Sequence, residues 1–123
     1  MKSPQPLGRE QLEAVARLFR VLAEPTRLAI LQALKEKPSS VSNLVARLDA
    51  RQANVSKQLG ILHAAGLLTR ERRGSLVCYS IGEPMIFDLC ELVCDKLRRD
   101  AARQVEALKN GAWVSNGKKG RRG

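Results

Sequence analysis

Residues 39–66 read SSVSNLVARLDARQANVSKQLGILHAAG, and this stretch decides the fold. It contains two blocks of apolar residues at helical spacing, Val41, Leu44, Val45 and Leu48 and then Val55, Leu59 and Leu62. The hydroxyls of Ser39 and Ser40 can cap the first predicted helix, and Gly66 can end the second. Residues 49–51 form a brief turn between the two helices. Two short helices joined by such a turn are typical of a helix-turn-helix motif.

Two further helices are expected before this motif. The first carries an apolar stripe of Leu12, Val15, Ala16, Phe19 and Leu22. The second has Pro25 in its first turn, where proline is tolerated, and continues from Arg27 to Lys35. Its apolar residues are Leu28, Leu31 and Leu34, and Pro38 ends it.

The pattern changes to alternation after the motif, which predicts two strands at 67–72 and 76–81. Residues 73–75, with Gly74 at the centre, form the expected hairpin turn. The faces of the second strand are expected to carry Val77, Tyr79 and Ile81 on one side and Leu76, Cys78 and Ser80 on the other.

A long helix of about seven turns is expected from Pro84 onward. Its apolar stripe consists of Ile86, Cys90, Val93, Leu97, Ala101 and Leu108. An apolar stripe of this length is expected to be buried against another surface, and a second copy of the chain is the simplest partner. The order of helix, helix, helix-turn-helix, hairpin and long helix is that of a winged helix. The predicted fold class is therefore mainly α with a small β-hairpin, a dimeric winged helix-turn-helix.

The domain organisation follows from these elements. We expect a flexible N-terminal arm at 1–10, one DNA-binding and dimerisation domain at 11–109, and a disordered basic tail at 110–123. The first ten residues lack the apolar segment of a signal peptide, and no apolar run approaches the ~20 residues of a membrane span. The three cysteines are an odd number, which favours reduced thiols in the cytoplasm.

The composition indicates a soluble globular protein with a polyanionic partner. The 123 residues are 44% hydrophobic, and 22 Lys and Arg against 12 Asp and Glu give a formal net charge of +10. Such a charge favours DNA, RNA or an anionic membrane surface as partner. Only 3% of the residues are aromatic, which leaves few side chains for the base stacking that RNA recognition uses.

Three segments resemble signatures of the ArsR/SmtB family of repressors. Residues 18–31, LFRVLAEPTRLAIL, resemble the family's second helix. Residues 55–59, VSKQL, with Leu62 and 66–68, resemble its recognition helix, and residues 72–81 resemble its wing. The resemblance runs from about Leu12 to Leu97. It implies a homodimer paired through its first and last helices, a palindromic DNA operator, and an inducer that weakens DNA binding.

The fourth helix and the hairpin carry residue types suited to DNA. Gln52, Asn54, Lys57 and Gln58 lie in the first two turns of that helix, where side chains reach base edges. Arg51 and Ser56 are placed for phosphates. Three arginines of the hairpin suit phosphate or minor-groove contact, namely Arg70, Arg72 and Arg73. The alternative is that this is only a solvated polar face.

The metal sites that the resemblance implies are expected to be absent. Residues 40–43 read SVSN where a third-helix site has Cys-x-Cys, and hydroxyls are poor ligands for soft metals. The positions of a last-helix site hold Glu83, Met85, Lys96 and Arg99, and two cations are incompatible with it. Gln32 stands where relatives that sense sulfide or redox state have a second-helix cysteine. We expect no resident cofactor.

Cys90 and Cys94 lie one turn apart on one face of the last helix. Together they could bind a soft metal ion or be oxidised by persulfide or peroxide, which makes them a candidate thiol sensor. The alternative is packing, because cysteine behaves as a small hydrophobe and Cys90 fits the apolar stripe. Roles for Cys78, His63 and Trp113 stay open.

No enzyme is expected, because no nucleophile stands beside a base and the chain contains one histidine and no Gly-rich phosphate loop. The main alternative to a repressor is a winged-helix module for protein interaction or dimerisation. A further alternative is a constitutive DNA-binding protein that has no inducer.

Overall fold

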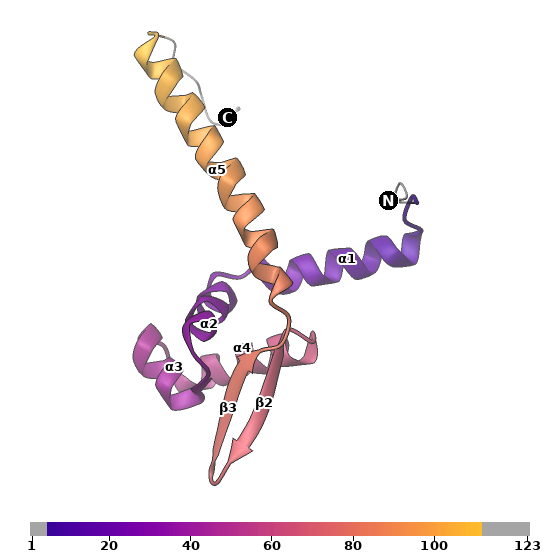
Figure 1. Cartoon of the computed structure of the whole chain (residues 1–123), viewed down its shortest axis with the longest axis vertical. Coiled ribbons are helices and arrows are strands. Elements are labelled where there is room, and N and C mark those ends of the chain that lie inside the picture. Colours follow the sequence, from indigo (N-terminus) through magenta and orange to yellow (C-terminus); the bar gives the residue numbers. More distant parts are fainter. Residues whose placement is uncertain (1–4, 112–123) are drawn as a thin grey trace. The chain divides into compact units, whose positions relative to one another are not determined.

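The computed structural model describes residues 5–111. Within them the helices and strands follow in the order α1 (Arg9–Leu22), α2 (Pro25–Glu36), β1 (Ser39–Ser40), α3 (Val41–Leu48), α4 (Gln52–Ala64), β2 (Leu68–Arg73), β3 (Leu76–Ile81) and α5 (Met85–Lys109) (Figure 1). The chain divides into two compact units, the first ending at Glu83 and the second beginning at Pro84. The predicted winged helix-turn-helix order is confirmed. Most of the predicted tail, including Trp113, lies outside the described residues.

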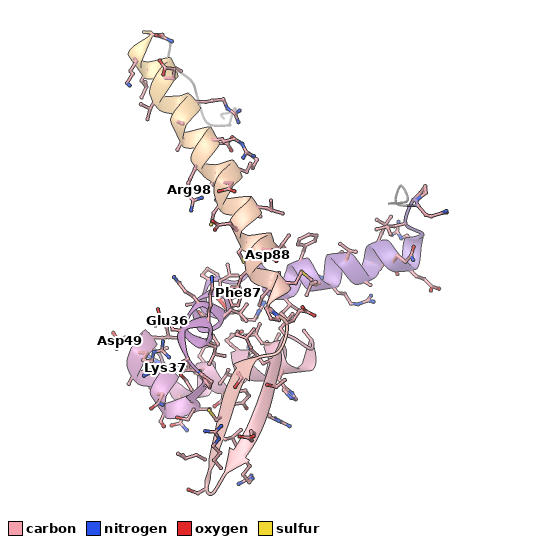
Figure 2. The ribbon with its side chains drawn as sticks, in the orientation of Figure 1. Glu36, Lys37, Asp49, Phe87, Asp88 and Arg98 are labelled. Carbon is pink, nitrogen blue, oxygen red and sulfur yellow. The ribbon has the colours of Figure 1, made fainter. Side chains whose placement is uncertain are left out.

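Local capping explains where the helices of the first unit begin and end. Glu24 accepts hydrogen bonds from the N–H groups of Thr26 and Arg27 at the start of α2. The Oγ of Ser40 accepts from the N–H of Asn43 and so caps α3, as predicted. Asp49 ends α3 in the left-handed conformation, with a φ of 50°, at the position labelled in Figure 2. Gly66, with a φ of 81°, turns the chain after α4.

The sheet has three antiparallel strands in the order β1-β3-β2, and β1 was not predicted. Ser39 and Ser40 therefore pair with Tyr79 and Cys78 of β3. Only Ser40 has the predicted capping role, because the hydroxyl of Ser39 donates to the carbonyl of Lys37 over 3.2 Å instead. The β2–β3 hairpin closes through Gly74 and Ser75 alone, so its turn is one residue shorter than expected. In Figure 1 the hairpin tip projects away from the helices of this unit.

The core of the first unit forms where α2, α3 and α4 meet. Leu44, Val55, Leu59 and Leu62 are fully buried, together with Ile30 of α2. Burial of one such side chain contributes about 1.5–3 kcal/mol. The helical spacing of these residues puts them on the inner sides of α3 and α4, so the opposite side of α4 is left to polar residues.

The second unit contains α5, whose 25 residues agree with the predicted length. Ion pairs join neighbouring turns of the helix, including Arg98 with Asp95 at 2.6 Å. Lys96 and Arg103 both pair with Asp100 and lower the pKa of its carboxyl. The apolar residues Leu92, Val93, Leu97, Val105 and Leu108 are exposed.

Candidate nucleic-acid interface

The fourth helix separates its residues cleanly into an inner and an outer side. Val55, Leu59 and Leu62 are buried, whereas the side exposed to solvent carries Gln52, Asn54, Ser56 and Lys57. Arg51 precedes the helix at its N-cap position and is also exposed. Five of the six residues predicted to contact DNA in and just before α4 therefore lie on an accessible surface.

The N-terminus of α4 lacks a side-chain cap. Arg51 occupies the N-cap position with extended backbone, and its side chain makes no capping hydrogen bond. The first N–H groups of a helix have no partner within the helix, and they favour anions. The arginine side chain and these N–H groups thus offer positive charge and donors at the same end of α4.

Gln58 differs from its prediction as a base-contacting residue. Its side chain is on the inner side of α4, and the residue is only 7% exposed. Its Oε1 accepts a hydrogen bond of 2.7 Å from Nη1 of Arg27, and its Nε2 donates over 3.0 Å to Oδ1 of Asn54. Because both ends of the amide are occupied, Gln58 acts within the protein in this structure.

Arg27 has a structural role that the sequence pattern did not indicate. It lies in the first turn of α2, and its Nε donates to the carbonyl of Val21 over 2.5 Å. Its Nη2 donates to the carbonyl of Arg20 over 3.2 Å, so the side chain joins the end of α1 to α4. Glu24 and Pro25, just before Arg27, indicated that a helix begins here. They did not indicate the contact of Arg27 with Gln58, which is distant in the sequence.

The hairpin arginines lie on two different faces. In the observed register Arg70 pairs with Tyr79 and Arg72 with Val77, so both arginines share the face of these residues. Arg73 lies on the opposite face, where its Nε donates to Oε1 of Glu71 over 2.7 Å. This hydrogen bond raises the pKa of Arg73. Arg70 and Arg72 thus form one basic row, and Arg73 belongs to a separate ion pair.

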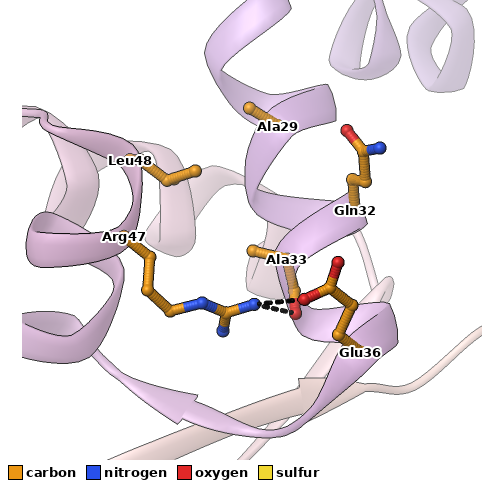
Figure 3. Close-up of a pocket in the computed structure, with 6 residues that line it drawn as sticks. All are labelled: Ala29, Gln32, Ala33, Glu36, Arg47 and Leu48. Atoms are coloured by element: carbon orange, nitrogen blue, oxygen red, sulfur yellow. Dashed lines mark hydrogen bonds and ion pairs between the residues drawn. The ribbon is translucent and has the colours of Figure 1, made fainter.

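A second arginine, Arg47, joins α2 and α3 at a shallow cavity of about 250 Å³ (Figure 3). Its Nη2 donates over 3.0 Å both to the carbonyl of Ala33 and to Glu36, and its Nη1 donates over 2.8 Å to the hydroxyl of Ser39. The exposed residue Gln32 lines the same cavity. The guanidinium of Arg47 is occupied by these contacts within the protein. We therefore assign the cavity to the packing of α2 against α3.

The three cysteines belong to elements other than α4. Cys94 is exposed and Cys90 half-buried on α5, while Cys78 is half-buried on β3. Among the described residues, no three side chains of His, Cys, Asp or Glu form a group that could hold a metal ion. His63 is half-buried near the end of α4. No helix in residues 5–111 is both long and apolar enough for a membrane crossing.

Comparison with known proteins agrees with this architecture. A helix-turn-helix domain model matches residues 22–71. The repressor SmtB of Mycobacterium tuberculosis is 44% identical over 80 residues, which are 65% of this chain and 59% of that protein. This chain therefore spans less than two thirds of that relative. The regulator Rv0081 of the same organism is 34% identical over 96 residues, 77% of this chain and 84% of that protein.

Solved structures support the same assignment. The crystal structure of Rv0081 superposes with a TM-score of 0.71 at 32% identity and covers 80% of this chain and 99% of that one. The homodimeric winged helix-turn-helix domain of Mb0332 from Mycobacterium bovis, a possible ArsR-family regulator, has a TM-score of 0.65 at 26% identity. It covers 78% of this chain and 92% of that one.

Fold, surface and relatives together define a winged helix-turn-helix transcription regulator. More particularly, the chain belongs to the ArsR/SmtB family of helix-turn-helix transcriptional repressors. The family resemblance predicted from residues 18–31, 55–59 and 72–81 is confirmed.

Proposed function

We propose that this chain is a homodimeric repressor that binds a palindromic operator in double-stranded DNA. The observation that carries the proposal is the exposed polar side of α4 with its uncapped N-terminus, in the same compact unit as the hairpin row of Arg70 and Arg72. The net charge of +10 adds a general attraction to the DNA backbone. A module for docking proteins would not need these donors on a helix that can enter a groove.

Each group of the interface has its own task in this proposal. Gln52, Asn54 and Lys57 contact base edges in the major groove, and Arg51 and Ser56 hold phosphates beside it. Arg70 and Arg72 extend the contact along the backbone or into the minor groove, with a smaller part for Arg73. The interface supplies no catalytic group.

Dimerisation is proposed from two apolar surfaces. Leu12, Val15 and Phe19 are 41–51% exposed on α1, and α5 exposes a second set that includes Leu97. A second copy would remove these side chains from water, at about 25 cal/mol for each Å² buried. The homodimeric state of the Mb0332 domain supports this arrangement. The two α4 helices would then meet half-sites about one helical turn apart.

The thiols of the last helix are proposed to sense a chemical signal. Cys94 is accessible and Cys90 lies one turn before it, so a soft metal ion or a thiol oxidant can reach this face of α5. Reduced thiols of this kind agree with action in the cytoplasm.

The proposal is tested with a randomised duplex library and the purified protein. We expect selection of a two-fold symmetric sequence and a dimer in sedimentation. Lys57→Ala should weaken binding to the selected sequence by about tenfold, since a good base contact is worth about 1–3 kcal/mol. Lys37→Ala is the matched control, because Lys37 is an exposed lysine at the end of α2. A folded dimer that selects no sequence would favour the docking module instead.

A further inference from the structure

Three hydrogen bonds hold the guanidinium of Arg27 between the end of α1 and the buried side of α4. Two of them go to the carbonyls of Arg20 and Val21, which belong to the last turn of α1. Carbonyls in that position lack the regular helical partner four residues on, although that of Arg20 also accepts from the N–H of the C-cap residue Ala23. The positive charge suits the negative end of the helix dipole. The third hydrogen bond goes to Gln58. The orientation of Arg27 is therefore fixed by α1 and not by Gln58.

This contact decides the orientation of the Gln58 amide. The oxygen and nitrogen of an amide are hard to tell apart by shape, so chemistry must assign them. A guanidinium can only donate hydrogen bonds, and the atom of Gln58 that faces Arg27 at 2.7 Å must therefore be Oε1. The Nε2 group is then the one that faces Asn54 at 3.0 Å.

The orientation of the Asn54 amide follows from that of Gln58. Because Nε2 of Gln58 is a donor, the atom of Asn54 that faces it must be the acceptor Oδ1. The Nδ2 group of Asn54 is left as the free end of the amide, and Asn54 is exposed on α4. A relay from Arg27 through Gln58 to Asn54 thus turns the donor end of Asn54 outward.

We propose that Arg27 and Gln58 are positioning residues that make Asn54 a hydrogen-bond donor toward the operator. This inference rests on the proposed DNA-binding function. Asn54 then reads an acceptor in the major groove, such as N7 or O6 of guanine or O4 of thymine. It does not make the bidentate contact to adenine that asparagine can otherwise form, because that contact needs the oxygen and the nitrogen together.

The substitution Gln58→Glu reverses the relay with almost no change of shape. A carboxylate still accepts from Arg27, but it cannot donate to Asn54. It accepts from Nδ2 of Asn54 instead, so the Asn54 amide turns over and presents Oδ1 outward. The base preferred at this position should change to adenine or cytosine, whose amino groups donate in the major groove.

The experiment compares the sequences selected from a randomised duplex library by the wild-type protein and by variants. Asn54→Ala identifies the base position, since selectivity there should be lost. At that position Gln58→Glu should raise the ratio of bases that have a major-groove amino group (adenine and cytosine) to bases that have none (guanine and thymine) by about tenfold, the effect of one good contact. Gln32→Glu is the control, because it makes the same chemical change at an exposed position of α2, outside the proposed interface, and leaves the relay intact.

The outcomes separate the positioning role from the proposed function. If the wild-type protein selects a sequence and folded Gln58→Glu selects the same base at the Asn54 position, the positioning proposal is wrong and the function stands. If the wild-type protein selects no sequence, the function fails and the inference falls with it. In the DNA-free protein, a scalar coupling across the hydrogen bond from Gln58 Nε2 to the Asn54 carbonyl group would support the relay, and its absence would contradict it.

Discussion

Nη1 of Arg27 donates to Oε1 of Gln58 over 2.7 Å and joins residues that are 31 positions apart in the chain. This contact ties the start of α2 to the inner side of the helix that we propose to enter DNA. It also places a charged group at the junction of α1, α2 and α4, where the carbonyls of Arg20 and Val21 are its other partners.

Removal of this guanidinium should destabilise the fold. Arg27→Met leaves the oxygen of buried Gln58 without its donor, and an unsatisfied buried group costs about 1–3 kcal/mol. The free energy of unfolding from urea titration measures the effect. Arg17→Met, at an exposed position of α1, should change it by less than about 0.5 kcal/mol. Equal effects of the two substitutions would contradict the role given to Arg27.

The cap of α2 should make stability depend on pH in the acid range. The N–H of Thr26, with that of Arg27, lowers the pKa of Glu24 below its ordinary value of 4.5. The folded state therefore binds this proton less readily than the unfolded state. The stabilisation is present above about pH 4.5 and is lost as the pH falls through the lowered pKa.

Glu24→Gln tests this dependence. Its melting temperature should lie below that of the wild-type protein at pH 7, and the difference should shrink as the pH is lowered below 4.5. Glu10→Gln, an exposed position in the first turn of α1, is the comparison. A difference between Glu24→Gln and the wild-type protein that grows on acidification would contradict the capping role.

The two faces of the hairpin predict unequal roles for its arginines. Arg72→Ala should weaken binding to all duplex sequences alike and lower the slope of log affinity against log salt by about 1. Arg73→Ala should have a smaller effect, because Arg73 pairs with Glu71 on the opposite face. Fluorescence anisotropy at several salt concentrations measures both. A larger loss in Arg73→Ala would mean that the other face of the hairpin meets the DNA.

If the thiols of α5 sense a signal, replacing both of them should abolish release of the protein from its operator. Arsenite, Cu(I) or persulfide should release the wild-type protein from its operator, whereas Cys90→Ala with Cys94→Ala should stay bound. Cys78→Ala is the control, since Cys78 lies on β3. Release of the double variant by the same agent would place the signal elsewhere. If no agent releases the wild-type protein, the cysteines serve packing.

The sequence predicted the helices well because each carries apolar residues at helical spacing between recognisable start and stop signals. It missed β1 because two serines show no alternation, and their pairing depends on β3, almost 40 residues away. Gln58 was assigned to the outer side because its residue type suits DNA. Its spacing, three after Val55 and four before Leu62, already indicated the inner side.

The remaining differences also come from contacts between distant segments. Arg27 and Arg47 each bind backbone carbonyls of another element, and no local pattern marks such partners. The unequal placement of the hairpin arginines follows from the register, in which Arg73 falls on the face opposite Arg72.

The most direct test of the central claim is a titration of the wild-type protein against the promoter DNA upstream of its own gene, at increasing salt. The account predicts tight binding of a dimer to a two-fold symmetric site, with an affinity that falls steeply with salt and is at least about 1,000-fold weaker for a scrambled duplex. Equal binding of the two duplexes by the folded dimer would contradict it.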